Sequence, residues 1–274
     1  MAEKLDVESL HQSNRAGWNE GAQAYEEDLA HQIDFLRKGG QNFCPPELPY
    51  LADLDRWCHR AIHIQCAGGT DTLSLWNRGA HEVVGIDISD RMIAVARAKS
   101  TALGAPATWI RSDILESPPD LDGTADLVYT GRGAICWIMD LDAWANVIFR
   151  LLKPGGKFYL FEGHPFASMW DLEASIFQFD KDFGDYFQNQ PIPSEGWPTT
   201  YIGDLGKPVE EHATKYERVW RLDQIVNAVL GSGLNLLKLE EHPNSFWDTY
   251  PNMDPDTVRR IPQTMSLLAE RPLD

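Results

Sequence analysis

Between residues 60 and 162, short runs of β-forming residues alternate with longer runs that have helical periodicity. The runs that predict strands cover residues 61–66, 82–86, 107–110, 126–129 and 157–161, and those that predict helices cover residues 72–78, 90–102 and 141–152. Alternation of this kind is typical of a parallel sheet that is covered by helices on both faces. The sequence therefore predicts a doubly wound α/β core.

Glycines follow two of the predicted helices and support this division. Gly79 follows the helix at 72–78, and Lys153-Pro-Gly-Gly156 follows the helix at 141–152. Glycine often ends a helix because it adopts the left-handed backbone conformation that most residues avoid. We expect both helices to end in this way before the chain re-enters the sheet.

The composition excludes several classes of partner. The 24 Lys and Arg residues stand against 41 Asp and Glu residues, and the formal net charge of -17 repels nucleic acid and anionic membranes. No apolar run approaches the roughly 20 residues of a membrane span, and residues 1–10 lack the apolar centre of a secretion signal. The four cysteines form neither a disulfide framework nor a zinc motif. We expect a soluble, cytoplasmic protein without a bound metal.

The stretch from Ile62 to Leu75 predicts a buried strand that runs through Ala67-Gly68-Gly69 into a helix. In an open parallel sheet, ligands bind at the carboxyl ends of the strands, where the first strand meets its helix. Backbone N–H groups at such a corner suit an anion or a carboxylate. The pyrophosphate of a dinucleotide and the methionine part of S-adenosylmethionine both fit, although the dinucleotide fingerprint G-x-G-x-x-G is absent. A purely structural turn is the alternative.

Asp87 ends the next predicted strand, about 20 residues after the glycine turn. A carboxylate at this spacing accepts hydrogen bonds from both hydroxyls of a ribose, which NAD and S-adenosylmethionine share. Asp87 or Ser89 could instead cap the helix at 90–102. The acid therefore indicates a nucleoside ligand without choosing between the two cofactors.

Several segments together resemble the class I S-adenosylmethionine-dependent methyltransferases, of the bacterial small-molecule type. They are residues 63–75, 84–93, 112–114, 126–129, 151–156 and 267–272. Lys153-Pro-Gly-Gly156, between a helix and a strand, is a specific element of that family. The resemblance implies a Rossmann-like sheet of seven mainly parallel strands with an antiparallel last strand. It also implies S-adenosylmethionine as cofactor and S-adenosylhomocysteine as product.

We expect one methyltransferase domain, residues 1–274, with four parts. Residues 1–59 form an N-terminal helical lid, because residues 7–30 have helical periodicity with Trp18 and Tyr25 on one face. Residues 60–162 form the cofactor-binding core, and residues 163–221 form an aromatic-rich insertion over the substrate. Residues 222–274 continue a helix that starts at Arg221 and end in an antiparallel pair of strands.

The resemblance implies a role for each matched position around the cofactor. The methionine part would contact Cys66, Ala67, Gly68 and Gly69, and the ribose would contact Asp87. The adenine would contact Ile88, Asp113 and Ile114, and the transferring methyl group would approach Thr130 and Gly131. Gln65 and Met92 are also expected to bind the cofactor. Tyr25 could close over the cofactor carboxylate or pack in the core, and Asp113 could instead cap a turn. The usual acid of the family's first strand is His63 here, and Gln65 and Ala67 replace its first two glycines.

Methyl transfer requires a nucleophile about 3 Å from the methyl group, opposite the sulfur and shielded from water. A base is needed only when the nucleophile must lose a proton. His164 is the expected catalytic base because it follows the fifth strand at the ligand-binding edge, although it could instead cap a loop. Glu162 is an alternative base or orients His164. Arg132 could steady an acidic substrate or lie at the surface, and His212 or Tyr216 could reach the pocket from the insertion.

Aromatic side chains are dense in the insertion, and they predict packing, an apolar or aromatic small-molecule substrate, or a homodimer interface. They are Phe166, Trp170, Phe177, Phe179, Phe183, Tyr186, Phe187, Trp197 and Tyr201. The acidic residues among them could instead attract an amine substrate. Two other functions stay open, a non-catalytic module that binds S-adenosylmethionine and an NAD(P)-dependent oxidoreductase.

Overall fold

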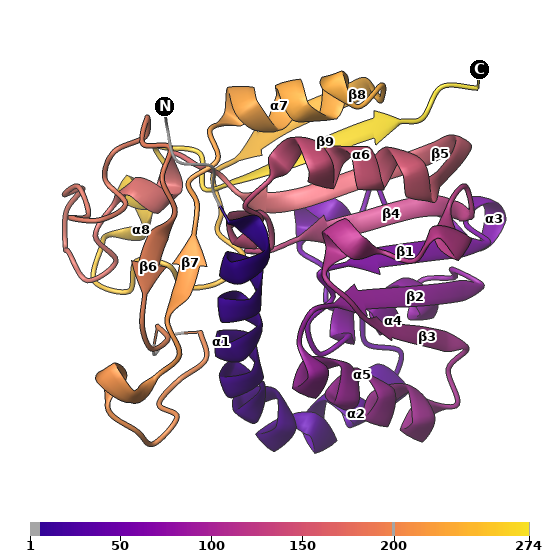
Figure 1. The fold of residues 1–274 in the computed structure, drawn as a ribbon, viewed down its shortest axis with the longest axis horizontal. Helices are drawn as coiled ribbons and strands as arrows, with labels where there is room; N and C mark the ends of the chain where they lie inside the picture. Colours follow the sequence, from indigo (N-terminus) through magenta and orange to yellow (C-terminus); the bar gives the residue numbers. More distant parts are fainter. Residues whose placement is uncertain (1–5, 199–200, 274) are drawn as a thin grey trace.

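The computed structural model describes residues 6–198 and 201–273, and a seven-stranded sheet forms its centre (Figure 1). The strands lie in the order β3-β2-β1-β4-β5-β9-β8. They are β1 (Arg60–Ile64), β2 (Glu82–Asp87), β3 (Ala107–Arg111), β4 (Ala125–Gly131), β5 (Leu152–Gly163), β8 (Asn235–His242) and β9 (Thr264–Glu270). β1 to β5 pair in parallel, and β9 pairs antiparallel with both β5 and β8. The predicted sheet with an antiparallel last strand is confirmed.

Helices cover both faces of the sheet, because successive residues of a strand point to opposite faces. Ile62 of β1 belongs to an apolar cluster that includes Trp144, whereas its neighbour Ala61 belongs to a second cluster that includes Leu75. The helices that cover the sheet are α3 (Leu54–Trp57), α4 (Thr70–Asn77), α5 (Asp90–Leu103), α6 (Leu141–Leu151) and α7 (Leu222–Gly231), with α5 packed in a third apolar cluster. Since both faces are covered, the loops at the strand ends are left to form a site.

The predicted N-terminal helix is two helices, α1 (Val7–Glu27) and α2 (Leu29–Arg37), which meet at Asp28. The Asp28 carboxylate accepts a hydrogen bond from Nε2 of Gln32 at 2.7 Å and so supports the first turn of α2. Figure 1 shows α1 standing between the sheet and the segment that holds β6 and β7. Because α1 contacts both α5 and β7, it can wall a site between the core and the insertion.

Lys153-Pro-Gly-Gly156 belongs to β5, which corrects our expectation that α6 ends in a left-handed glycine. α6 ends at Leu151, and β5 follows at once. Gly155 has a φ of +77°, and its N–H donates to the carbonyl oxygen of Arg271 at 2.8 Å. The left-handed glycine therefore serves an irregular start of the strand. Gly79, with a φ of +113°, does follow α4 as predicted.

The insertion between β5 and α7 contains a small antiparallel pair of strands, β6 (Ile192–Ser194) and β7 (Lys215–Glu217), which we did not predict. Many of its aromatic rings pack on one another, as where Trp170 and Phe179 stack with centroids 4.9 Å apart. Phe179 and Phe187 nevertheless expose 60% and 70% of their surface. Packing thus accounts for most of these rings but not for all.

Some features are absent from residues 6–198 and 201–273. No helix there has the length and apolar character to cross a membrane. No group of three or more His, Cys, Asp or Glu side chains in that part of the chain could hold a metal ion. The four cysteines, all of which are described, are free thiols.

Helix α8 (Pro255–Val258) is a single turn between β8 and β9 that we did not predict.

Candidate functional site

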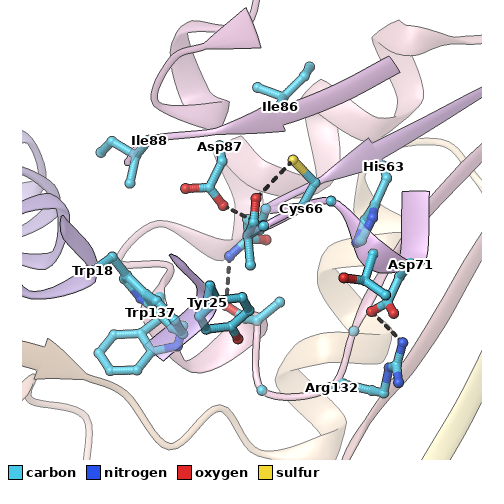
Figure 2. Close-up of a pocket in the computed structure, with 18 of the residues that line it drawn as sticks. Trp18, Tyr25, His63, Cys66, Asp71, Ile86, Asp87, Ile88, Arg132 and Trp137 are labelled. Carbon is cyan, nitrogen blue, oxygen red and sulfur yellow. Dashed lines mark hydrogen bonds and ion pairs between the residues drawn. The ribbon is translucent and has the colours of Figure 1, made fainter. Parts of the chain in front are cut away.

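A cavity of about 660 Å³, which we call the cofactor cavity, opens at the carboxyl ends of β1, β2 and β4 and is walled by α1 and α2 (Figure 2). Most positions that the resemblance implied line it, namely Tyr25, Gln65, Cys66, Ala67, Gly68, Gly69, Asp87, Ile88, Asp113, Ile114 and Gly131. Met92 and Thr130 do not line it, and both are fully buried. The cavity lies where ligands bind in open α/β sheets.

The glycine corner keeps its shape although two of its glycines are replaced. Gln65, Ala67 and Gly69 all have left-handed backbone conformations, with φ of +57°, +45° and +75°. A residue other than glycine adopts this conformation at a cost of about 1–2 kcal/mol. The Gln65 side chain offsets part of that cost, because it donates to the carbonyl oxygen of Ala134 at 2.6 Å and accepts from the indole N–H of Trp144 at 3.2 Å. The departures from the family pattern therefore preserve the corner.

The Asp87 carboxylate joins the glycine corner to the start of α5. One oxygen accepts from the Ala67 N–H at 2.8 Å, and the other accepts from the Ser89 N–H at 2.8 Å. The Ser89 hydroxyl accepts from the N–H of Met92, so Ser89 caps the helix as one of our alternatives predicted. Burial raises the pKa of Asp87 to about 6. Each oxygen keeps lone-pair capacity, which the two hydroxyls of a ribose can use.

Asp113 lines the cofactor cavity and is only 8% exposed. Its Oδ1 atom accepts from the Leu115 N–H at 3.0 Å, which is the turn cap that we kept as an alternative. Its Oδ2 atom lies 2.6 Å from Nδ1 of His11, a residue of α1. Because a carboxylate offers about four lone-pair sites, these contacts leave room for a further donor such as an adenine amino group.

Tyr25 packs over the glycine corner. A Cβ atom at Gly68 would lie 2.8 Å from the Tyr25 ring, so the glycine permits this approach. The Tyr25 hydroxyl lies 3.2 Å from the hydroxyl of Tyr201, and burial raises the pKa of Tyr25. The phenol is therefore neutral at pH 7 and can donate or accept a hydrogen bond at the end of the cavity where we expect the cofactor carboxylate.

Arg132 is not a surface residue, which settles one of the alternatives. Its side chain is only 14% exposed and forms an ion pair with Asp71 of α4. Both residues line the cofactor cavity, and Figure 2 shows the pair on the other side of Cys66 from Asp87. A pair of opposite charges thus lies in the wall of the cavity.

A second cavity of about 570 Å³, which we call the acceptor cavity, lies between the core and the insertion. Its wall is mainly apolar and includes Trp137, Trp170, Phe183, Trp197, Trp220, Phe246 and Trp247. Arg132, Gly133, Trp137, Tyr201, Phe246 and Trp247 line both cavities. The two cavities therefore meet at the loop that follows β4.

Glu162 holds that loop and does not offer a free carboxylate. Its two oxygens accept hydrogen bonds from the backbone N–H groups of Gly133, Ala134, Ile135 and Gly163. Burial raises the pKa of Glu162, whereas the backbone hydrogen bonds oppose this effect. With both oxygens occupied in this way, the geometry argues against Glu162 as the alternative base.

His164 lines the acceptor cavity, but its ring is also engaged. Nδ1 accepts from the Phe166 N–H at 3.2 Å, so a neutral ring carries its proton on Nε2. Nε2 lies 2.9 Å from a carboxylate oxygen of Glu241, in ion-pair contact but without the geometry of a hydrogen bond, and burial lowers the pKa of His164. In this conformation the ring has no lone pair for a substrate proton, which argues against our prediction of a catalytic base. His212 and Tyr216 line neither cavity.

The site contains residues that the sequence analysis missed. They include His11, Asp71, Trp137, Glu217 and Trp247. Asp71 carried a usable signal, since it lies in the first turn of the helix that follows the glycine pair. The others come from segments without a local motif, and tertiary packing alone brings them to the cavities.

Two comparisons with known sequences bear on the site. Residues 61–156 match the sequence model of a family described as Methyltransferase domain. Over 132 residues, the chain is 33% identical to a demethylmenaquinone methyltransferase from Thermus thermophilus. This match covers 43% of the chain and 58% of that relative, so the chain spans little more than half of the relative's length.

Solved structures share the fold. An S-adenosylmethionine-dependent methyltransferase from Mesorhizobium loti is similar with a TM-score of 0.55 at 21% identity, over 82% of this chain and 97% of that one. Geranyl diphosphate C-methyltransferase from Streptomyces coelicolor A3(2), in complex with Mg²⁺, geranyl-S-thiolodiphosphate and S-adenosyl-L-homocysteine, is similar with a TM-score of 0.52 at 13% identity. That match covers 88% of this chain and 76% of the other. The family match at residues 61–156 and the shared fold bear out the resemblance to class I methyltransferases.

Proposed function

We propose, from the premise that this chain is a class I S-adenosylmethionine-dependent methyltransferase, that it methylates a small apolar or aromatic molecule. S-adenosylmethionine would occupy the cofactor cavity, with its ribose on Asp87 and its adenine near Asp113. The sulfonium supplies an activated methyl group, and the nucleophile is an O, N, S or C atom of the acceptor. The chain's contribution is to hold the two molecules in line and to exclude water.

The observation that carries the proposal is the junction of the two cavities. Gly133 and Trp137, after β4, line both the cofactor cavity and the acceptor cavity. The Glu162 carboxylate fixes this loop through the N–H groups of Gly133 and its neighbours. A methyl group presented at the junction would thus face an acceptor across a loop that cannot shift without breaking several hydrogen bonds.

The wall of the acceptor cavity supports an apolar or aromatic substrate. Its tryptophan and phenylalanine side chains offer large apolar faces, and a volume of about 570 Å³ suits a small molecule. Two similar proteins are named for the substrates demethylmenaquinone and geranyl diphosphate, both of which have large apolar parts. We extend that acceptor class to this chain.

Labelled methyl transfer tests the proposal. The protein is incubated with S-adenosylmethionine labelled at the methyl group and with a fractionated metabolite extract. Label should enter an apolar small-molecule fraction with wild-type protein and with Asp120→Ala, which removes an exposed acid outside both cavities. Asp87→Ala should transfer little label. Binding of the cofactor without transfer to any fraction would favour a non-catalytic module, and stabilisation by NAD or NADP alone would favour an oxidoreductase.

Three further expectations belong to the proposal. The exposed rings of Phe179 and Phe187 support a homodimer through the insertion. The free thiols support a cytoplasmic location, where cysteines stay reduced. The division into a lid at 1–59, a core at 60–162, an insertion at 163–221 and a C-terminal part at 222–274 stays a prediction, and residues 1–5, 199–200 and 274 lie outside the described structure.

A further inference from the structure

Arg132 has an unusual position at the end of β4. Its backbone is left-handed, with a φ of +57°, and its N–H donates to the carbonyl oxygen of Phe161 at 2.8 Å. A residue other than glycine in this conformation is strained, and such strain tends to be retained where a side chain must be aimed. The conformation directs the Arg132 side chain into the wall of the cofactor cavity, against Asp71 (Figure 2).

The guanidinium of Arg132 is incompletely satisfied. Its Nε and Nη2 atoms are buried and have no hydrogen-bond partner within the described residues, although Nη2 lies in ion-pair contact with Asp71. A guanidinium offers five N–H donors, and burial makes each unused donor costly. A bound group with acceptor oxygens, such as a carboxylate, would satisfy them.

The nearby ionisable groups do not replace such a ligand. Burial lowers the pKa of His63 to about 4, so His63 is neutral at pH 7. Burial raises the pKa of Glu47 to about 7, and Glu47 already accepts from the Tyr129 hydroxyl at 2.7 Å. Asp71 is only 21% exposed and accepts from the side-chain amide of Asn42 at 2.7 Å. Among the described residues that line the cofactor cavity, Asp71 and Arg132 thus form the one ion pair between a carboxylate and a guanidinium or ammonium group.

We propose that Arg132 and Asp71 together bind the zwitterionic end of the cofactor, with the guanidinium on the methionine carboxylate and the Asp71 carboxylate on the methionine ammonium. This inference rests on the proposed function. The two charges on the α-carbon of methionine match the two charges of the pair, and both residues lie beside the glycine corner that takes the methionine part. The pair also supplies a carboxylate to a chain whose first strand carries neutral His63 where the family has an acid.

Three probes separate the parts of the cofactor in calorimetric titrations of the full chain. S-adenosylhomocysteine carries both charges, S-adenosyl-3-thiopropylamine lacks the carboxylate, and 5′-methylthioadenosine lacks the whole amino-acid part. Arg132→Met should weaken the binding of S-adenosylhomocysteine at least tenfold. It should change the dissociation constants of the other two probes less than twofold. Asp71→Asn should weaken the binding of S-adenosylhomocysteine and S-adenosyl-3-thiopropylamine, which both carry an ammonium group. It should leave the dissociation constant of 5′-methylthioadenosine within twofold of wild type.

A surface ion pair provides the matched control. Arg150 and Asp122 form an ion pair of the same kind and line neither cavity. Arg150→Met and Asp122→Asn should leave all three affinities within twofold of wild type. Arg132→Lys replaces the planar guanidinium by a single ammonium group and keeps the positive charge, so it tests the same point if Arg132→Met does not fold. It should weaken the binding of S-adenosylhomocysteine and leave the affinity for 5′-methylthioadenosine unchanged.

The outcomes distinguish this inference from the proposed function. Equal losses for S-adenosylhomocysteine and 5′-methylthioadenosine would overturn the inference, because the pair would then only shape the corner. Unchanged binding of S-adenosylhomocysteine in Arg132→Met and Asp71→Asn would also overturn it. A wild-type protein that binds none of the three probes would contradict the proposed function itself.

Discussion

The Nδ1 atom of His11 lies 2.6 Å from the Oδ2 atom of Asp113 and ties α1 to the loop after β3. The Nε2 atom of the same ring accepts from the N–H of Met139 at 3.1 Å. Because Nε2 uses its lone pair in this way, the proton of the neutral ring is on Nδ1, and His11 donates to Asp113. The first helix of the chain is therefore part of the wall that positions the expected adenine acid.

His11→Ala should weaken adenine recognition specifically. The loss of a hydrogen bond to a buried carboxylate frees Asp113 to move, and we expect S-adenosylhomocysteine to bind about tenfold more weakly. S-inosylhomocysteine carries a carbonyl in place of the adenine amino group, so it should bind wild type more weakly than S-adenosylhomocysteine does. Its dissociation constant should change less than twofold in His11→Ala. Calorimetric titration of both ligands measures this difference, and equal losses would show that His11 only stabilises the fold.

Cofactor affinity should depend on pH through Asp87. Burial raises the pKa of Asp87 to about 6, so the carboxylate is charged above this pH and protonated below it. Only the charged form accepts from both ribose hydroxyls while it also holds the N–H groups of Ala67 and Ser89. The dissociation constant of 5′-methylthioadenosine should be constant above about pH 7 and rise as the pH falls from 7 to 5.

Asp87→Asn supplies the control for this pH dependence. The variant has no titrating group at this position, so its affinity should be low and nearly independent of pH between 5 and 8. A wild-type profile as flat as that of Asp87→Asn would contradict the assignment of the ribose to Asp87.

The same side chain has the opposite effect on the unliganded fold. Since its pKa is raised on folding, its contribution to the free energy of unfolding decreases as the pH rises toward 6.

Gly131→Ala should destabilise the protein strongly. Gly131 has a φ of +155°, and a Cβ atom there would lie 1.8 Å from the carbonyl oxygen of Phe161. The neighbouring strand β5 would have to move, because backbone cannot yield as a flexible side chain does. We expect a fall of several degrees in the melting temperature or loss of soluble protein, measured by circular dichroism. Gly123→Ala is the matched control, because Gly123 has a φ of +62° and no atom near the position of its Cβ.

Glu217 and His164 both line the acceptor cavity, and mutation separates their roles for an acceptor that must lose a proton. Glu217 lines this cavity, its carboxylate accepts from the Ser194 hydroxyl at 3.3 Å, and burial raises its pKa. Glu217→Gln should lower labelled methyl transfer at least about tenfold and leave the affinity for S-adenosylhomocysteine unchanged. His164→Gln should lower labelled methyl transfer less than about threefold, because both ring nitrogens already face protein groups. A larger loss in His164→Gln than in Glu217→Gln would restore His164 as the base.

The sheet and the cofactor end of the site were predictable because their signals are local. Strand and helix periodicity placed β1 to β5, and the glycine corner followed by Asp87 marked the edge where a nucleoside binds. Ligand-facing glycines leave a sequence pattern because the backbone conformation restricts the residue type. The departures at Gln65 and Ala67 did not reveal from the sequence that both positions keep the left-handed conformation.

The rest of the site depends on contacts between distant segments. His11 and Asp113 are 102 residues apart, and neither lies in a pattern that points to the other. Glu162 looked like a base because of its position at a strand end, but the fold turns four backbone N–H groups toward it. The insertion has neither periodicity nor motif, so its small strands and the acceptor cavity could not be predicted from the sequence.

Binding of S-adenosylhomocysteine to the wild-type protein tests the central claim most directly. The claim is that a sulfonium nucleoside lies along the carboxyl edge of β1 and β2, with its ribose on Asp87. Calorimetry should give one site of micromolar affinity in wild type and a dissociation constant more than tenfold higher in Asp87→Ala. No heat of binding with either S-adenosylmethionine or S-adenosylhomocysteine, from a folded wild-type protein, would contradict it.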